Sequence, residues 1–143
     1  MTPISLHLRV EARQAAQGSK RLYGRNLVET NKGLPAYRKA IVTACEDAGY
    51  AGMQLTGPLD VTLEFGMRRP KAHYTAHGEL RPDAPYWCPT PPDVDKLQRA
   101  VFDALSHPGA HVIDDDRLIA HVDARTVYAP GSPYTDIHLT TLT

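Results

Sequence analysis

Hydrophobic and polar residues alternate in four stretches of this chain, and such alternation predicts β-strands that bury one face. The stretches are residues 3–11, 59–65 and 118–128 and a last strand after the Pro/Gly-rich turn at 129–133. In the last strand, Ile137 and Leu139 are expected to point inward. Half-buried strands of this kind require other elements to cover their apolar face.

Two further stretches repeat their apolar residues with the 3.6-residue period of an α-helix. The first covers residues 35–48, where Pro35 suits the first turn and Gly49 suits the end of the helix. The second covers residues 93–106. Its apolar stripe consists of Val94, Leu97, Val101 and Leu105.

Two connections lack strong periodicity. Residues 12–33 are expected to form a basic, partly flexible loop, and residues 67–92 form a long proline-rich connection. The long connection carries Arg68, Arg69 and Lys71, which suits contact with phosphates, although a solvated loop with incidental charge explains the same composition. The order of elements is strand, helix, strand, loop, helix, strand, strand. This order predicts one small α+β domain over all 143 residues, with two main helices on one face of a mixed sheet.

The composition is that of an ordinary globular protein, because 42% of the residues are hydrophobic and 22% are charged. There is no run of about 18 apolar residues that would predict a transmembrane helix, and the N-terminus is typical of a strand and not of a signal peptide. Cys45 and Cys88 lack metal-type spacing. We therefore expect a reduced, cytoplasmic protein without a membrane partner, with Cys45 in the core.

Charge is unevenly distributed although the formal net charge is zero. Residues 1–81 hold 12 Lys and Arg against 7 Asp and Glu, whereas residues 82–143 hold 4 against 9. A basic half and an acidic half suit a protein that approaches a polyanion with one surface and holds cations with another. The alternative is that the folded surface mixes both halves.

Two groups of aspartates flank the second predicted helix. Asp93 and Asp95 open the helix, and the run Asp114-Asp115-Asp116 precedes the third strand. If the chain folds back after the helix, both groups meet at one end of it, and their oxygens form a site for a hard cation such as Mg²⁺. The alternative needs no metal: Asp93 caps the helix, Asp95 benefits from the helix dipole, and Arg117 compensates a solvated acidic turn.

Arg99 lies one turn after Asp95 and one turn before Asp103. This spacing suits salt bridges with both aspartates, and it also suits a cation that offsets charge on a phosphate during cleavage. Two histidine pairs, in residues 73–77 and 107–111, lie in Pro/Gly-rich stretches where a transition-metal site is not expected. Trp87 either packs on the core, which we favour, or stacks on a base.

The residues from Pro92 to Leu105 and from Val112 to Ile119 resemble the signature of the RusA family of Holliday-junction resolvases, the crossover junction endodeoxyribonucleases. That signature is an Asp-x-Asp that opens a helix, a basic residue four positions later, a helix that ends in Asp-Ala-Leu, and an Asp-Asp pair that leads into a strand. The stretch 69–74 and the Pro-rich loop after it resemble a version of the family common in phages and prophages of actinobacteria.

The resemblance implies a Mg²⁺-dependent endonuclease, with Mn²⁺ as a substitute, that acts as a homodimer on four-way DNA junctions in recombination and repair. Position by position, Asp93, Asp95 and Asp115 are the implied metal ligands. Asp114 is the neighbouring candidate, and the extra Asp116 leaves the register of this second cluster open by one residue.

Basic residues are implied in both catalysis and DNA binding. Arg99 falls where the family often has a catalytic lysine, and arginine keeps the charge but cannot give up a proton. The residues expected to contact DNA are Arg68, Arg69, Lys71 and Lys96. Two rival interpretations remain: a nuclease of the same chemistry for flaps or forks, and a non-catalytic DNA-binding or structural module whose aspartates only cap and solvate.

Overall fold

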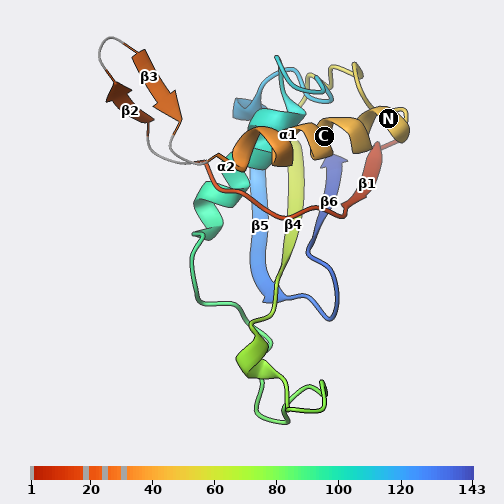
Figure 1. Cartoon of the computed structure of the whole chain (residues 1–143). Helices are drawn as coiled ribbons and strands as arrows, with labels where there is room; N and C mark the ends of the chain where they lie inside the picture. Colours follow the sequence, from red (N-terminus) through yellow and green to blue (C-terminus); the bar gives the residue numbers. More distant parts are fainter. Residues whose placement is uncertain (1, 18–19, 24–25, 30–31) are drawn as a thin grey trace.

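A four-stranded mixed sheet forms the centre of the protein in a computed structural model, which describes residues 2–17, 20–23, 26–29 and 32–143 (Figure 1). Its strands are β1 (Ser5–Val10), β4 (Leu59–Met67), β5 (Ile119–Tyr128) and β6 (Tyr134–Thr141), in the order β1-β6-β4-β5. β4 and β5 are parallel, and the other two pairings are antiparallel. Parallel neighbours need a crossover connection, and here the long connection and the second helix supply it.

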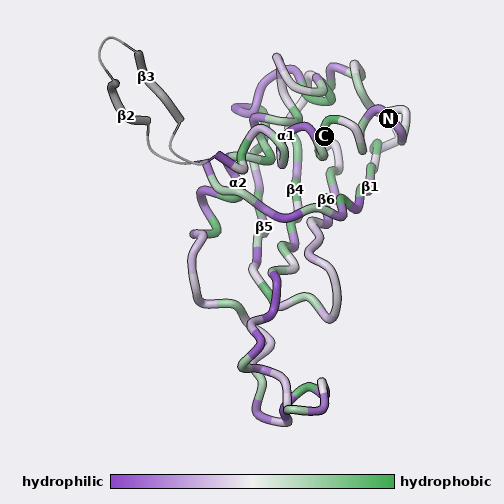
Figure 2. Tube along the Cα trace, in the orientation of Figure 1, coloured by the Kyte–Doolittle hydropathy of each residue, from purple (hydrophilic) through white to green (hydrophobic). Residues whose placement is uncertain are grey.

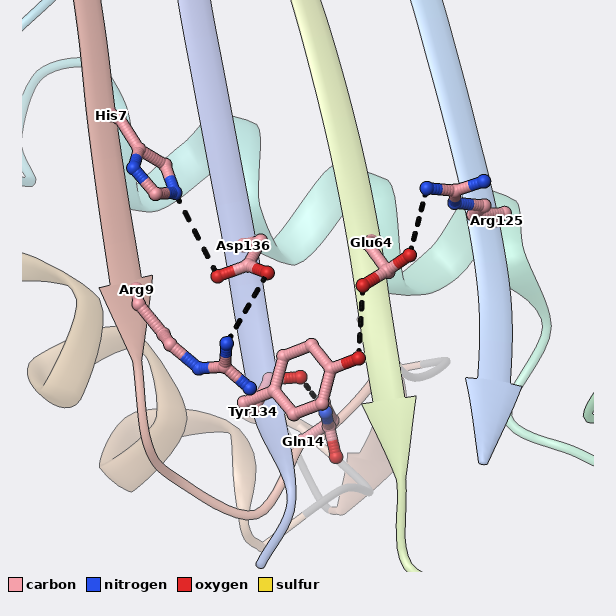
Figure 3. Close-up of polar contacts among 7 residues, drawn as sticks. All are labelled: His7, Arg9, Gln14, Glu64, Arg125, Tyr134 and Asp136. Atoms are coloured by element: carbon pink, nitrogen blue, oxygen red, sulfur yellow. Dashed lines mark hydrogen bonds and ion pairs between the residues drawn. The ribbon is translucent and has the colours of Figure 1, made fainter. Parts of the chain in front are cut away.

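Two α-helices, α1 (Leu34–Asp47) and α2 (Val94–Leu105), pack together on one face of the sheet. The polar side chains drawn in Figure 3 lie on the other face. Their inward residues are fully buried and join the apolar face of the strands in one core. These residues are Leu34, Tyr37, Ile41 and Cys45 of α1 and Leu97, Ala100, Val101, Ala104 and Leu105 of α2. The predicted α+β class is confirmed, and so is the burial of Cys45, Ile137 and Leu139.

One position of the predicted helix stripe is wrong. Val94 keeps 38% of its surface exposed, because it is the first residue of α2 and the buried face of the helix begins only at Leu97. The tube in Figure 2 changes repeatedly between hydrophobic and hydrophilic residues along the strands of the main sheet, as a sheet with one buried face requires.

The prediction that residues 12–33 form only a loop is also wrong. They contain two strands, β2 (Lys20–Tyr23) and β3 (Asn26–Glu29), which pair antiparallel with each other and form a separate two-stranded sheet. Four residues are too few to produce a clear alternation in sequence, so pairing between the strands, and not a local pattern, defines them.

The long connection between β4 and α2 projects beyond the end of the sheet (Figure 1). It contains a short 3₁₀ helix, η1 (Lys71–His73), and returns to the sheet at Trp87, which forms an isolated bridge with Val127 of β5. No helix in the described part of the chain has the length and apolar character needed to cross a membrane.

The open face of the sheet carries polar side chains, and one row of them is internally neutralised (Figure 3). One row across the four strands consists of Arg9, Asp136, Glu64 and Arg125. Arg9 lies 3.7 Å from Asp136, and Arg125 lies 2.8 Å from Glu64. Glu64 also accepts a hydrogen bond of 2.9 Å from the Tyr134 hydroxyl. Because each cation in this row has an acidic partner, the row presents no uncompensated charge to a polyanion.

Candidate active site

The first acidic group lies at the start of α2. Asp93 is the N-cap residue, and its carbonyl oxygen accepts hydrogen bonds from the amides of Lys96 and Leu97, each at 3.1 Å. The Asp93 side chain makes no capping bond, and both Asp93 and Asp95 are exposed. The capping position was therefore predicted correctly, but the carboxylate itself is not used by the helix. Among the described residues, neither carboxylate has an ion-pair partner.

The second acidic group follows the opposite end of α2. The carbonyl of Leu105 accepts hydrogen bonds from the amides of Val112 and Ile113, at 2.8 and 3.3 Å, and the Asp114 amide donates to Leu55 at 2.9 Å. α2 has 12 residues and is therefore roughly 18 Å long. The expectation that the chain folds back and brings both groups to one end of the helix is not met. The described residues contain no group of three or more His, Cys, Asp or Glu side chains that would hold a metal ion.

Each of two aspartates in the second group has its own partner. Asp115 accepts a hydrogen bond of 2.8 Å from the Arg117 amide, and its other oxygen lies 3.8 Å from the Arg117 guanidinium. The amide hydrogen bond, with a smaller contribution from the guanidinium charge, holds the pKa of Asp115 below its ordinary value. Asp114 lies 3.6 Å from His111. These contacts explain how a run of three aspartates is tolerated without a metal.

Arg99 is exposed and lines a cavity of about 710 Å³ between the two helices. Asp103, its neighbour one turn further along α2, pairs instead with Arg38 of α1 at 2.9 Å. Within the described part of the chain no ion pair involves Arg99, so the predicted salt bridges with Asp95 and Asp103 are absent. The positive charge of Arg99 is therefore not neutralised by its own helix.

The residues expected to contact DNA fall into two groups. Arg68, Lys71 and Lys96 are exposed. Arg69 is partly buried: its guanidinium donates to the carbonyl of Pro85 at 2.7 Å and lies 4.9 Å from the centre of the Tyr128 ring. These contacts tie the start of the long connection to Pro85 and to the end of β5.

A second cavity, of about 620 Å³, opens beside the start of α2. Arg68, Thr90 and Pro92 line it from the long connection, and Arg13 lines it from the segment after β1. Arg13 was not singled out from the sequence; the only signal was the basic character of residues 12–33. The two arginines give this cavity a positive rim next to Asp93.

Trp87 was expected to pack on the core, and this is wrong, because 58% of its surface is exposed. Its neighbour Cys88 is buried instead. Of the histidine pairs, His107 and His111 have ring centres 5.3 Å apart, but they belong to no group of three or more side chains that could hold a metal ion among the described residues.

A family model described as endodeoxyribonuclease RusA matches residues 10–140. The match covers most of the chain and includes both helices and both acidic groups, so the protein is an endodeoxyribonuclease. The chain belongs to the RusA family, whose nucleases act on Holliday junctions. A comparison with curated proteins gave no match.

Proposed function

We propose that this protein resolves four-way DNA junctions by Mg²⁺-dependent hydrolysis of one phosphodiester in each of two strands, in DNA recombination and repair. The observation that carries the proposal is the pair of exposed carboxylates, Asp93 and Asp95, at the start of α2, which neither cap the helix nor pair with a described cation. Membership of a nuclease family disfavours the non-catalytic alternative, in which these aspartates only cap and solvate.

The carboxylate oxygens of Asp93 and Asp95 are suitable ligands for Mg²⁺. Mg²⁺ takes oxygen ligands and is usually held by one or two carboxylates, together with water and substrate phosphates. Asp93, the N-cap residue, and Asp95, in the first turn of α2, supply two such carboxylates. When bound, the metal would polarise the phosphate and activate the attacking water. Mn²⁺ prefers similar oxygen ligands and is expected to substitute.

Asp115 is the proposed third ligand, with Asp114 as its neighbouring candidate. Asp115 follows the carboxyl end of α2, so it is separated from Asp93 and Asp95 by most of the helix. A homodimer removes this difficulty if the Asp93 end of one protomer meets Asp115 of the partner subunit. Two-fold symmetry would then create two equivalent sites, as paired and symmetric nicks require.

Basic side chains of the chain complete the proposed site. Arg99 lies one turn after Asp95, and its permanently charged guanidinium would stabilise negative charge on the phosphate without transferring a proton. Arg68, Lys71 and Lys96 are exposed and suit contact with backbone phosphates, which position DNA without reading its sequence. Arg69 would act mainly by holding the long connection in shape. We expect this reaction to take place in the cytoplasm of a bacterial host cell or of a phage-infected cell.

The test is cleavage of a labelled four-way junction, beside linear duplex and a flap, in Mg²⁺, Mn²⁺, Ca²⁺ or EDTA. Paired symmetric nicks on the junction, dependent on Mg²⁺ or Mn²⁺, are expected. Asp95→Asn should abolish cleavage and spare junction binding, whereas Asp47→Asn, at the exposed end of α1, is a matched control that should cut normally. Preferred cleavage of flaps or forks, or wild-type nicking by Asp95→Asn, would overturn the proposal.

A further inference from the structure

Tyr86 and Trp87 form an exposed aromatic pair on the long connection. Their exposed fractions are 54% and 58%, and their rings meet edge to face with centres 5.2 Å apart. Aromatic side chains of this size are largely buried on average. Two adjacent exposed rings are therefore typical of a surface that binds another molecule.

The backbone that carries the aromatic pair is held firmly against the sheet. The carbonyl of Tyr86 accepts a hydrogen bond of 2.9 Å from the Tyr128 amide, and the Cys88 amide donates to Thr126 at 3.1 Å. Trp87 itself bridges Val127 in antiparallel fashion, so this segment extends the sheet beyond β5. A fixed backbone presents the rings at a low cost in conformational entropy on binding.

Two contacts just outside the pair strengthen this support. The Arg69 guanidinium donates to the carbonyl of Pro85, the residue before Tyr86, at 2.7 Å. The Thr126 hydroxyl donates to the carbonyl of Cys88 at 2.9 Å. The buried side chain of Cys88 anchors the segment on one side, while the Trp87 ring stays accessible on the other.

The aromatic pair precedes the proposed cleavage site by a short stretch of sequence. Asp93 is the sixth residue after Trp87, so the two lie at most roughly 20 Å apart. The cavity lined by Arg13 and Arg68 is also lined by Cys88, Thr90, Pro91 and Pro92. Exposed cations on the same connection, Arg68 and Lys71, are suited to the phosphates of a strand that passes over the rings.

We propose that Trp87, supported by Tyr86, stacks on a base that is unstacked at the branch point of a DNA junction. The inference rests on the proposed function, because it takes branched DNA as the substrate. In a continuous duplex each base face is covered by its neighbours, whereas a branch point leaves faces accessible to an aromatic side chain. The aromatic pair thereby contributes selectivity for branched DNA over linear DNA.

The test uses the fluorescence of Trp87, which is the only tryptophan in the chain. Wild-type protein is titrated with a four-way junction in Ca²⁺, so that binding is observed without cleavage. Stacking on a base is expected to quench the fluorescence, and a linear duplex of equal length should quench it far less. This measurement needs no variant and therefore does not depend on how well a variant folds.

Variants then measure the contribution to affinity. Trp87→Ala should weaken junction binding by about 10-fold or more, in line with the loss of a stacked base, and should leave duplex binding almost unchanged. Trp87→Phe should retain most of the affinity. Leu80→Ala, at another exposed apolar residue of the same connection, is the control and should bind as the wild type does.

Three results would overturn the inference. The first is equal quenching of Trp87 fluorescence by the junction and the duplex, and the second is wild-type affinity of Trp87→Ala for the junction. The third is a fluorescence change that depends on protein concentration in the absence of DNA, which would show that a second copy of the chain covers Trp87. Failure of the proposed function is distinguishable: Trp87 would then be quenched by branched DNA in Ca²⁺, but no junction would be cut in Mg²⁺.

Discussion

Arg38 of α1 and Asp103 of α2 form an ion pair of 2.9 Å that joins the two helices. This contact takes Asp103 away from Arg99, its neighbour one turn earlier on α2, and Arg99 has no ion-pair partner in the part of the chain that the structure describes. The charge of Arg99 is thus available at the cavity between the helices.

Replacement of Arg99 should affect catalysis and not folding. Arg99→Ala should lower the single-turnover rate of junction cleavage by about 10²- to 10³-fold, the loss typical of one group that stabilises transition-state charge. Arg99→Lys should recover much of the rate because it keeps the positive charge. Thermal unfolding of both variants should match the wild type. A fall in melting temperature that parallels the loss of rate would instead assign Arg99 a structural role.

Replacement of the ion pair should affect stability and not catalysis. Each side chain is 36% exposed, so solvent screens the pair, and a double-mutant cycle of Arg38→Ala and Asp103→Ala should give a coupling of about 0.5 kcal/mol in urea unfolding. The coupling should shrink at high salt. Asp103→Ala should cut junctions at the wild-type rate, and a large loss of cleavage there would show that Arg99 depends on Asp103 after all.

Gly66 of β4 is required by the ring of Tyr134 on the neighbouring strand. A Cβ atom at this position would overlap the ring, and the ring is held in place because its hydroxyl donates to Glu64 at 2.9 Å. Gly66→Ala should lower the free energy of unfolding by about 1–3 kcal/mol, the usual cost of an overpacked site. Gly131→Ala, where a Cβ meets nothing within 4 Å, is the control and should unfold like the wild type.

Asp115 should stabilise the fold in a pH-dependent way. Its pKa is lowered in the folded protein, chiefly by the hydrogen bond from the Arg117 amide. The stabilisation is therefore present above the pKa of the unfolded chain and is lost as the pH falls through the folded-state pKa. An NMR titration of the Asp115 carboxyl should give a midpoint below the ordinary value of about 3.9.

The variant Arg117→Ala separates the two causes of this shift. It removes the guanidinium but leaves the amide, so the Asp115 midpoint should rise only part of the way to its ordinary value. A complete return to the ordinary value would mean that the guanidinium charge, and not the amide, is the dominant cause.

Local pattern in the sequence was sufficient for most of the architecture. The two-residue alternation of β1, β4, β5 and β6 and the 3.6-residue repeat of α1 and α2 can be read from short stretches of sequence. This is because each element must turn its apolar side chains toward the same core. The pair of acidic residues at the start of α2 was likewise visible in the sequence, because Asp93 and Asp95 are only two positions apart. The resemblance to the RusA family rested on the same local stretch, and the match over residues 10–140 agrees with it.

Tertiary structure alone decided which distant residues meet. β2 and β3 form because two short strands pair with each other. Asp103 pairs with Arg38 because α1 lies alongside α2. The backbone of Trp87 joins the edge of β5, and its side chain stays exposed. The separation of Asp93 from Asp115 belongs to the same class of facts: the amides of Val112 and Ile113 bind the carboxyl end of α2, so the chain does not return to the start of the helix. Spacing along a chain sets an upper bound on distance, and packing determines whether two side chains meet.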